Sequence, residues 1–541
     1  MNLLDEPWIP VRRHDGESDW IRPAQLGDPA LAAFDACRAD FNGALAQFAI
    51  GLLQTCAPAE DLSSWRQWLR DPPDAATLDP CLAPHRAAFE LDGDGPRFMQ
   101  DLTLRADEGE PLSVANLLIE TPGENAIRNN SDHFIKRGRV TAICPHCAAL
   151  ALFTLQINAP SGGAGHRTGL RGGGPLTTLL AVAAAPNRPT SLWQTLWINV
   201  RESAVFMPEP LAPGMAQPSR TFPWLAPQEA LQQGQAGQLT PAQVHPAHVF
   251  WAMPRRIRLD FEQAAPGGSC DLCGREAAQR LSHYVTRNYG LNYKGAWLHP
   301  LSPYYQGKEG LLPLHPQPDG LGYRHWLAWV LGVHDDKKRV APAQVLATLA
   351  QRERAAGLPL RVWAFGYDMD NMKPRGWYES TVPLYALGEC GPAAHKMLRE
   401  EVGSWLAGAE FALGALRIAV KNAWFGHEAR GDLGFVDAAF WSRTEPLFYP
   451  LLRDRIHALR DGVDADPLQI AENWRRALCA TALRLFDREL VGAGAVERQH
   501  PDRVSHARRQ LGQSLNGSKL RAALSLPEPV GEPKKTQRRT G

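Results

Sequence analysis

Apolar side chains recur every three or four residues through a long stretch of the C-terminal third of the chain. They run from Leu398 through Trp405 to Trp424, which places them on one face of a helix. Gly391-Pro392 precedes this pattern, and proline is favoured in the first turn of a helix. The pattern therefore predicts one long helix that begins near residue 392.

Three further segments of the same region show helical periodicity. They lie at Phe435–Leu459, where Pro446 and Pro450 are expected to interrupt the helix, from Asp466-Pro467 to Leu485, and at about Asp502–Leu524. Short connections between helices favour antiparallel neighbours. The C-terminal region is therefore predicted to form a four-helix bundle.

The preceding 390 residues mix helical and extended patterns. A mostly helical stretch is expected from Leu31 to Leu69 with a break near Pro58, and another helix from Pro145 to Gln156. Extended segments are expected at Arg256–Phe261, Tyr323–Val330 and Leu360–Gly366.

These patterns predict an α+β protein with two domains. Residues 1–390 are expected to form a large irregular α/β N-terminal domain, and residues 391–526 the four-helix bundle. Residues 527–541 are basic and lack an apolar pattern, so a disordered tail is expected there.

Composition adds little to this division. Hydrophobic residues make up 44% of the 541 residues and charged residues 21%, which is ordinary for a soluble protein. The formal net charge of +1 neither indicates nor excludes nucleic acid. No secretory signal and no apolar run long enough to span a membrane are present, so a cytoplasmic location is expected.

Four of the nine cysteines form two C-x-x-C pairs, Cys144/Cys147 and Cys270/Cys273. Such a turn directs two thiolates at one ion, and zinc prefers four tetrahedral ligands. The alternative, two unrelated buried pairs, would leave the shared spacing without an energetic reason. We predict one structural Zn²⁺, because four thiolates leave no coordination position open for catalysis. His146 is expected to be a bystander.

No Asp or Glu occurs from His133 to Arg201, a window that also contains the glycine-rich sequence SGGAGHRTGLRGGGP (161–175). Lys and Arg without nearby carboxylates favour an approach to phosphates, and glycine lets the backbone come close to a partner. The lysine-containing phosphate-loop pattern is absent. The glycines alone also fit a flexible connector, but the missing acids and the two interleaved arginines favour a backbone surface that lies on nucleic acid.

Asp368 and Asp370 form a D-x-D motif. In some transferases this motif binds Mg²⁺ with a nucleotide, but alone it matches by chance often. The alternative function that it offers is a Mg²⁺-dependent nucleotide-processing enzyme that uses these two carboxylates. We find no nucleophile motif to accompany them.

Several unusual segments, in this order, resemble CasA, the large subunit of the type I-E CRISPR surveillance complex Cascade. They are NLLDEPWIPV (2–11), HFIKRG (133–138) leading into CPHCAALALF, NAPSGGAGHRTGLRGGGPLTT (158–178), CDLCG (270–274), WLHPLSPYY (297–305) and GYDMDNMKPRGWYE (366–379). The resemblance covers the chain to about residue 525. It implies a non-catalytic subunit that recognises the short motif beside a double-stranded DNA target (the PAM) and starts to open the duplex for pairing with guide RNA.

The resemblance also assigns residues. It implies that a glycine loop enters the minor groove of the DNA, that a basic finger follows the second C-x-x-C at Arg287, and that a wedge at Asp370–Lys373 parts the first base pairs. The implied DNA-binding residues are Ser161, Gly162, Gly163, Ala164, Gly165, Arg167, Arg287, Asn371, Met372 and Lys373. The implied RNA-binding residues are Asn130, His133 and Phe134.

The partners implied by the resemblance are the other Cascade subunits, the guide RNA, the target DNA and a recruited CRISPR helicase–nuclease. Basic side chains on the last helix, Arg508 and Arg509 among them, suggest contact with the displaced strand or with that nuclease. A solvated basic face explains them equally well.

Overall fold

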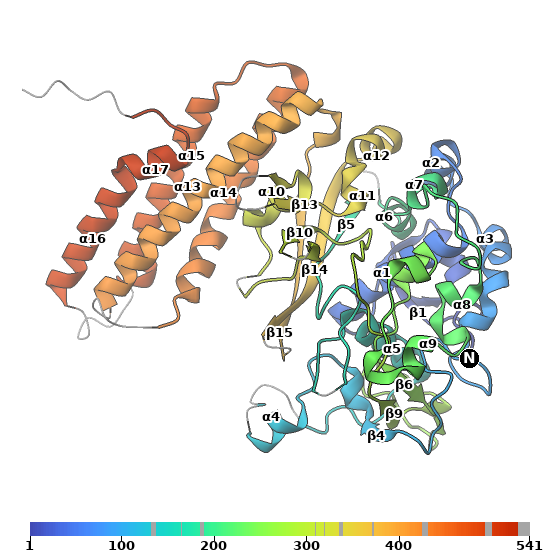
Figure 1. Ribbon diagram of the computed structural model, residues 1–541. Helices are drawn as coiled ribbons and strands as arrows, with labels where there is room; N and C mark the ends of the chain where they lie inside the picture. Colours follow the sequence, from blue (N-terminus) through green and yellow to red (C-terminus); the bar gives the residue numbers. More distant parts are fainter. Residues whose placement is uncertain are drawn as a thin grey trace, which may run out of the picture. The chain divides into compact units, whose positions relative to one another are not determined.

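A computed structural model describes residues 1–130, 132, 137–163, 165–183, 189–308, 310–318, 320–334, 339–370, 373–424, 431–492 and 500–528 (Figure 1). The chain divides into two compact units. The N-terminal unit comprises residues 1–321 and 328–384, and the C-terminal unit comprises residues 322–327 and the chain from residue 385 onward.

The N-terminal unit contains small antiparallel sheets rather than one large sheet. Their orders are β2-β1-β3, β11-β10-β13-β12, β15-β14-β5, β4-β9-β6 and β7-β8. The strands are β1 Ile9–Arg13, β2 Ser18–Ile21, β3 Leu31–Phe34, β4 Glu110–Ser113, β5 Thr177–Val182, β6 Arg256–Leu259, β7 Glu262–Gln263, β8 Gln279–Arg280, β9 His283–Arg287, β10 Tyr304–Gly307, β11 Gly310–Pro313, β12 Val333–His334, β13 Arg339–Ala341, β14 Leu360–Asp370 and β15 Lys373–Pro383.

Helices pack beside these sheets, and helices, strands and loops all contribute buried side chains to the core. The helices that precede residue 384 are α1 Ala39–Cys56, α2 Leu62–Arg70, α3 Ala75–Leu82, α4 Glu124–Arg128, α5 Pro145–Asn158, α6 Leu192–Trp197, α7 Ser203–Phe206, α8 Pro218–Thr221, α9 Glu229–Gln232, α10 Trp326–Val330, α11 Gln344–Ala347 and α12 Leu349–Ala356. Phe48 of α1 lies at the centre, in edge-to-face contact with Trp8, Phe89, Phe98, Phe153 and Trp251. Such ring pairs add to the stability that their buried area provides.

Helix α5 positions the site described below, and its sequence explains its burial. It is apolar on every face, and all of its residues except His146 are buried. A helix without a polar face is stable only inside a core, so α5 is fixed by contacts around its whole circumference. This helix was predicted correctly from the sequence.

The C-terminal unit is helical within the part that the structure describes. Its helices are α13 Pro392–Trp424, α14 Gly434–Asp461, α15 Pro467–Arg484, α16 Pro501–Asn516 and α17 Ser518–Ala523. α13 contacts each of the other four, and Figure 1 shows the four longest running alongside one another. Trp405, Phe448 and Trp474 form the aromatic core of the C-terminal unit, and the Trp474 indole N–H donates to the Trp405 backbone carbonyl at 3.0 Å.

Three predictions of secondary structure are wrong. Leu31–Phe34 is strand β3 rather than the start of a helix, because it pairs with β1 through Val11↔Phe34. Tyr323–Val330 is a 3-10 turn followed by α10 rather than a strand. α14 continues through both of its prolines, since Phe440, Thr444, Phe448, Leu452 and Ile456 bury one face of it and offset the lost hydrogen bonds. No helix of the described chain is both long and apolar enough to cross a membrane.

Candidate functional site

The four cysteines of the two C-x-x-C pairs converge. Their sulfur atoms all lie within 4.8 Å of one another, and the Sγ atoms of Cys144 and Cys273 are 3.7 Å apart. Metal–sulfur bonds of about 2.3 Å in a tetrahedron place sulfur atoms about 3.8 Å apart, so the cluster fits one tetrahedral ion. Hydrogen bonds from Cys144, and then from Cys147 and Cys273, lower the pKa of Cys270.

Local structure explains how segments far apart in the sequence meet at this four-cysteine cluster. Cys144 caps the N-terminus of α5, and its sulfur accepts from the Cys147 backbone N–H at 3.5 Å. The Asp271 carboxylate accepts from the Thr141 backbone N–H at 2.6 Å and from that of Ala142 at 2.9 Å. A bridge between Ile143 and Leu281 continues the contact. The cluster therefore fixes the start of α5 against the segment that leads to β9.

Side chains around the cluster complete this part of the site. His146 is not among the converging ligands; its ring lies 5.3 Å from that of Trp20, and burial lowers its pKa to about 4. Arg275 lies over the same tryptophan at 4.0 Å. The pKa of Cys37, to which the sequence assigned no chemistry, is lowered mainly by the neighbouring Cys147, but Cys37 is not one of the four converging thiols.

The glycine loop, Ser161–Gly165, leaves the C-terminus of α5. Gly163 has φ +63°, and among the described residues nothing lies within 4 Å of the position that a Cβ would occupy. Gly165 has φ +83°, and a Cβ there would lie 2.6 Å from the Cβ of Asn288. Both φ values favour glycine, but Gly163 faces open space whereas Gly165 packs against protein. Ala164 lies outside the described residues.

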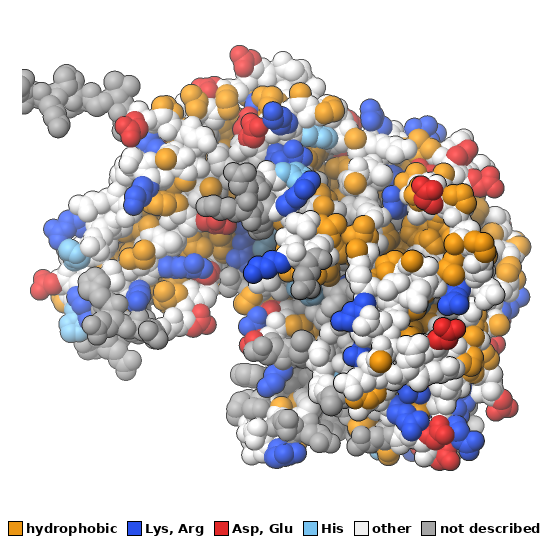
Figure 2. Space-filling view, in the orientation of Figure 1, with side chains coloured by type: hydrophobic (Ala, Val, Ile, Leu, Met, Phe, Trp, Pro, Cys, Tyr) orange, Lys and Arg blue, Asp and Glu red, His pale blue; other side chains and the backbone are white. Residues whose placement is uncertain are grey.

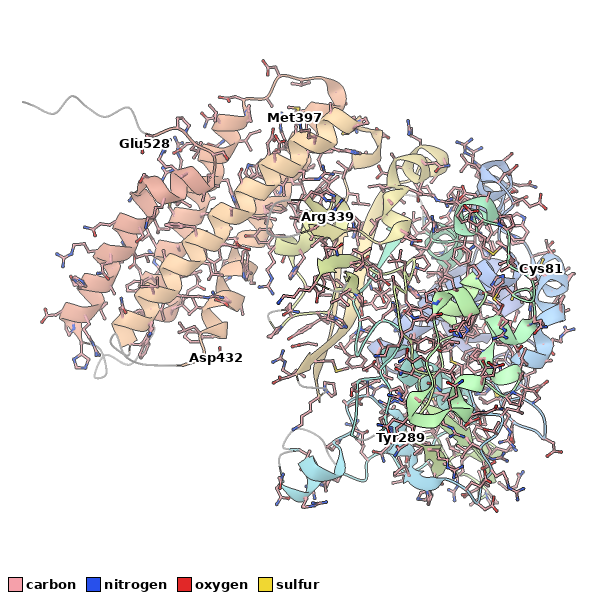
Figure 3. The ribbon with its side chains drawn as sticks, viewed as in Figure 1. Cys81, Tyr289, Arg339, Met397, Asp432 and Glu528 are labelled. Atoms are coloured by element: carbon pink, nitrogen blue, oxygen red, sulfur yellow. The ribbon has the colours of Figure 1, made fainter. Side chains whose placement is uncertain are left out.

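The finger segment, Arg287–Tyr289, comprises the last residue of β9 and the two that follow it, and Asn288 and Tyr289 touch this loop directly. The Tyr289 backbone N–H donates to the Gly165 carbonyl at 2.8 Å, and the Arg167 guanidinium lies 5.4 Å from the Tyr289 ring centroid. Figure 3 labels Tyr289 in this part of the N-terminal unit. Arg287 is half-exposed, and its guanidinium lies 4.0 Å from the Glu108 carboxylate. The structure therefore brings the predicted loop and finger segment together.

The wedge segment is the end of a long hairpin. β14 and β15 pair from Arg361↔Pro383 to Asp370↔Lys373, whereas β5 pairs with β14 only as far as Phe365. The hairpin therefore continues past its sheet, as Figure 1 shows. Lys373 is exposed, and Asn371 and Met372 lie outside the described residues.

A cleft of about 1260 Å³ joins the glycine loop to this hairpin. Ser161, Gly162, Gly163 and His166 line one part of it, Lys373 to Trp377 another, and Leu118 to Gly123 with Ala126 a third. Arg38 pairs with Asp40 at 2.9 Å and with Glu120 at 2.6 Å in its wall, and the Tyr367 hydroxyl also donates to Asp40. Figure 2 shows basic and acidic side chains interspersed over the face in view, without one continuous basic patch.

The two carboxylates of the D-x-D motif meet a cation from the protein itself. Arg375 donates to the buried Asp368 at 2.7 Å and lies 3.6 Å from Asp370. Among the described residues, the four-cysteine cluster is the one group of three or more His, Cys, Asp or Glu side chains with metal-binding geometry. The motif therefore has an arginine where a Mg²⁺ site would need further ligands.

The predicted RNA-binding segment is described in part. Asn130 has φ +48°, and its side-chain oxygen accepts from Arg137 at 3.3 Å. Arg137 also pairs with Asp132, which lines the cleft. His133 and Phe134 lie outside the described residues.

Comparison with known proteins identifies a family for the chain. The model of the family "CRISPR-associated protein Cse1" matches residues 2–485. Similar solved structures include Thermus thermophilus CasA (Cse1), at 18% identity with a TM-score of 0.65, covering 95% of this chain and 99% of that one. Thermobifida fusca Cse1 is 14% identical with a TM-score of 0.66, covering 97% of this chain and 98% of that one. A chain of a "CRISPR RNA-guided surveillance complex" is 16% identical with a TM-score of 0.66, covering 96% of this chain and 99% of that one. At these identities the structures share the fold.

Proposed function

Because the chain belongs to the CRISPR-associated Cse1 family, the CasA proteins of type I-E systems, we propose that it is the large, non-catalytic subunit of a Cascade complex. The family match spans most of the chain, and a similar chain comes from an RNA-guided surveillance complex. In this role the chain binds guide RNA through the segment around Asn130, contacts other Cascade subunits and works in the cytoplasm. The helices of the C-terminal unit form the family's four-helix bundle and help to recruit the helicase–nuclease.

Three elements of the N-terminal unit read the PAM: the glycine loop, the finger segment at Arg287 and the tip of the β14–β15 hairpin. The observation that carries this proposal is the cleft, which has the glycine loop on one wall and Lys373 of the hairpin on another. A backbone loop inserted in the minor groove reads its degenerate pattern loosely, so several PAM sequences are accepted. A hairpin tip beside it unstacks the adjacent base step at a cost of a few kcal/mol. Guide RNA pairing then supplies the sequence specificity.

The metal of the four-cysteine cluster is structural zinc in this proposal. Four thiolates close its coordination shell, so the ion supplies no catalysis and instead joins the start of α5 to the segment before β9. Those two elements lead to the glycine loop and to the finger segment. The ion therefore sets the relative position of the two elements that contact each other through Gly165 and Tyr289.

The arrangement around Asp368 favours this function over a Mg²⁺-dependent enzyme. A buried carboxylate paired with arginine is already neutralised, and a divalent cation would have to displace Arg375. The pairing instead stiffens the hairpin close to its tip. The purified chain should therefore not turn over nucleotides in the presence of Mg²⁺. A turnover that Asp370→Ala abolishes would support the enzyme instead.

Replacing Gly163 by Asp tests the proposed reading of DNA. The aspartate adds a charge and a side chain on the open side of the loop, so the assembled complex should lose at least about 100-fold in affinity for a target duplex. Gly214→Asp is the matched control, since Gly214 also has positive φ and open space, outside the cleft. Guide RNA loading should survive in both variants. Unchanged DNA affinity of the Gly163→Asp complex at low and moderate salt would refute the loop's role.

A further inference from the structure

Arg255 lies at the root of the glycine loop, in the lining of the cleft. Its guanidinium donates to the carbonyl of Pro160, immediately before the loop. A Cβ on Gly162 would lie 3.9 and 4.0 Å from its two terminal nitrogens, so loop and guanidinium are in contact distance of each other. The cation therefore sits directly beside the loop backbone.

The backbone of Arg255 is held rigidly. Its N–H donates to the side-chain oxygen of Gln156 at 3.0 Å, and its carbonyl accepts from the Gln156 amide at 3.0 Å. Gln156 belongs to α5, the buried helix that starts at the four-cysteine cluster. Since a Cβ on Gly290 would lie 3.0 Å from the Arg255 nitrogen, the chain after β9 crosses here too. Arg255 is therefore fixed where the loop, α5 and the finger segment meet.

The charge of Arg255 has no counter-ion among the described residues. Burial lowers its pKa to about 10, with the nearby Tyr284 opposing this, and no carboxylate contributes. At neutral pH the guanidinium is still charged, and its Nε–H is buried without a hydrogen-bond partner. Its neighbours differ, because Arg256 pairs with Asp101 at 2.5 Å and Arg258 with Asp260 at 3.0 Å.

The acids of the cleft do not compensate Arg255 either. The described acidic side chains that line it are Asp40, Glu120 and Asp132, and each pairs with another arginine. A half-buried cation without a counter-ion is costly, and an anion that enters the cleft would relieve that cost. The unmatched charge thus favours an anionic ligand at this point.

We propose that Arg255 binds a backbone phosphate of the DNA strand against which the glycine loop lies. This inference rests on the proposed function and adds to it a residue that none of the predicted elements contains. A loop that enters a groove about 6 Å wide brings its root against the phosphates at the groove's edge, while its tip faces the bases. Arg255 is at the root, and the open side of Gly163 is at the tip.

The test compares Arg255→Gln with Arg258→Gln in the assembled complex loaded with guide RNA. The probe is a target duplex with the flank that the wild-type complex selects from a randomised library. Loss of one phosphate contact should weaken binding by about 10-fold and reduce the slope of log affinity against log salt by about 0.9. Arg258→Gln, three residues further along the chain but ion-paired with Asp260, should leave that slope unchanged, and Arg255→Lys should retain it.

Each other outcome is decisive. A wild-type salt slope for Arg255→Gln, together with loss of binding by Gly163→Asp, overturns the inference and leaves the proposed function standing. Wild-type DNA binding by both Arg255→Gln and Gly163→Asp overturns the inference and the proposed function together. If Arg255→Gln prevents guide RNA loading, or if Arg255→Lys assembles but loses the slope, Arg255 serves the fold or the RNA and the inference is wrong.

Discussion

Arg171 and Arg255 hold the two ends of the glycine-rich segment, residues 161–175, and neither has a carboxylate partner among the described residues. At the rear, Arg171 is 3% exposed and donates to the side-chain oxygens of Gln47, Thr177 and Ser302. At the front, Arg255 donates to one carbonyl and keeps a buried Nε–H without a partner. We call the end at Arg171 the closed end, because its polar groups are matched within the protein. The end at Arg255 is the open end, because it borders the cleft.

This difference separates a structural arginine from a ligand-binding one. Arg171 is buried and Arg255 is half-buried, yet burial lowers the pKa of each to about 10, so the pKa does not distinguish them. What differs is whether the protein itself supplies the acceptors. A buried polar group whose donors are matched stabilises a fold, whereas a cation that lines a cleft without a counter-ion indicates a site for a partner.

Removing the metal should affect both ends and give the largest effect. Cys147→Ser should lose the ion and about 5 kcal/mol or more of stability, because metal binding in such sites is part of the folding free energy. Metal content by mass spectrometry and urea unfolding of the full chain measure the two losses. Cys37→Ser is the control: the Cys37 thiol neighbours Cys147 but is not among the four converging thiols, so this variant should retain one zinc per chain. Loss of zinc in that control would mean that the ligand set is wrong.

Arg171→Met tests the closed end. The substitution leaves the oxygens of Gln47, Thr177 and Ser302 without their donor, so we expect a loss of about 3 kcal/mol in the free energy of unfolding. Arg255→Met should cost less than about 1 kcal/mol, since it removes one bond to a carbonyl and an unmatched charge. Urea unfolding of both variants compares them. Equal losses would show that the two ends do not differ as described.

Local signals in the sequence predicted the elements that depend on local chemistry. The spacing of Cys144 and Cys147, with Pro145 between them, identified both a metal ligand pair and the start of α5. The periodicity after residue 392 gave α13 in full, and Asp466-Pro467 gave the start of α15. In each case the determining residues lie within a few positions of one another.

Tertiary contacts decided what the sequence could not. Arg171 and Arg167 lie in the same window without acidic residues, so the sequence does not distinguish them. Only the hydrogen bonds of Arg171 to Gln47 and Ser302, far away in the chain, show that it is part of the core. Arg255 carried no signal, because Arg256 and Arg258 have the same composition around them and differ only in their carboxylate partners. The pairing of Leu31–Phe34 with β1 overrode its local helical pattern in the same way.

Gly165→Ala tests the contact between the loop and the finger segment. The new Cβ would strain a residue at φ +83° by about 1 kcal/mol and would meet Asn288, so DNA affinity of the complex should fall by about 10-fold. Gly163→Ala bears similar backbone strain but meets nothing, and should cost less than about 5-fold. Adding Asn288→Gly to Gly165→Ala removes the colliding Cβ and should restore part of the affinity. An effect of Gly165→Ala equal to that of Gly163→Ala would mean that this contact does not position the loop.

The smallest expected effect concerns the dependence of stability on pH at the closed end. Burial, and then the charge of Arg171, hold the pKa of His299 well below 6.5, so on acidification the unfolded chain takes up this proton first. This contribution to stability is complete above pH 6.5 and is lost as the pH falls, by up to about 1.4 kcal/mol per pH unit.

His299→Asn can keep the acceptor for the Leu301 backbone N–H, which donates to Nδ1 at 3.2 Å, while it removes the titration. Urea unfolding between pH 7.5 and 5 should therefore show a shallower loss of stability for His299→Asn than for the wild type. His283→Asn, at an exposed position of β9, should follow the wild-type curve. Parallel curves for His299→Asn and the wild type would show that the closed end holds no proton-linked stability, and that its matched hydrogen bonds alone distinguish it from the open end.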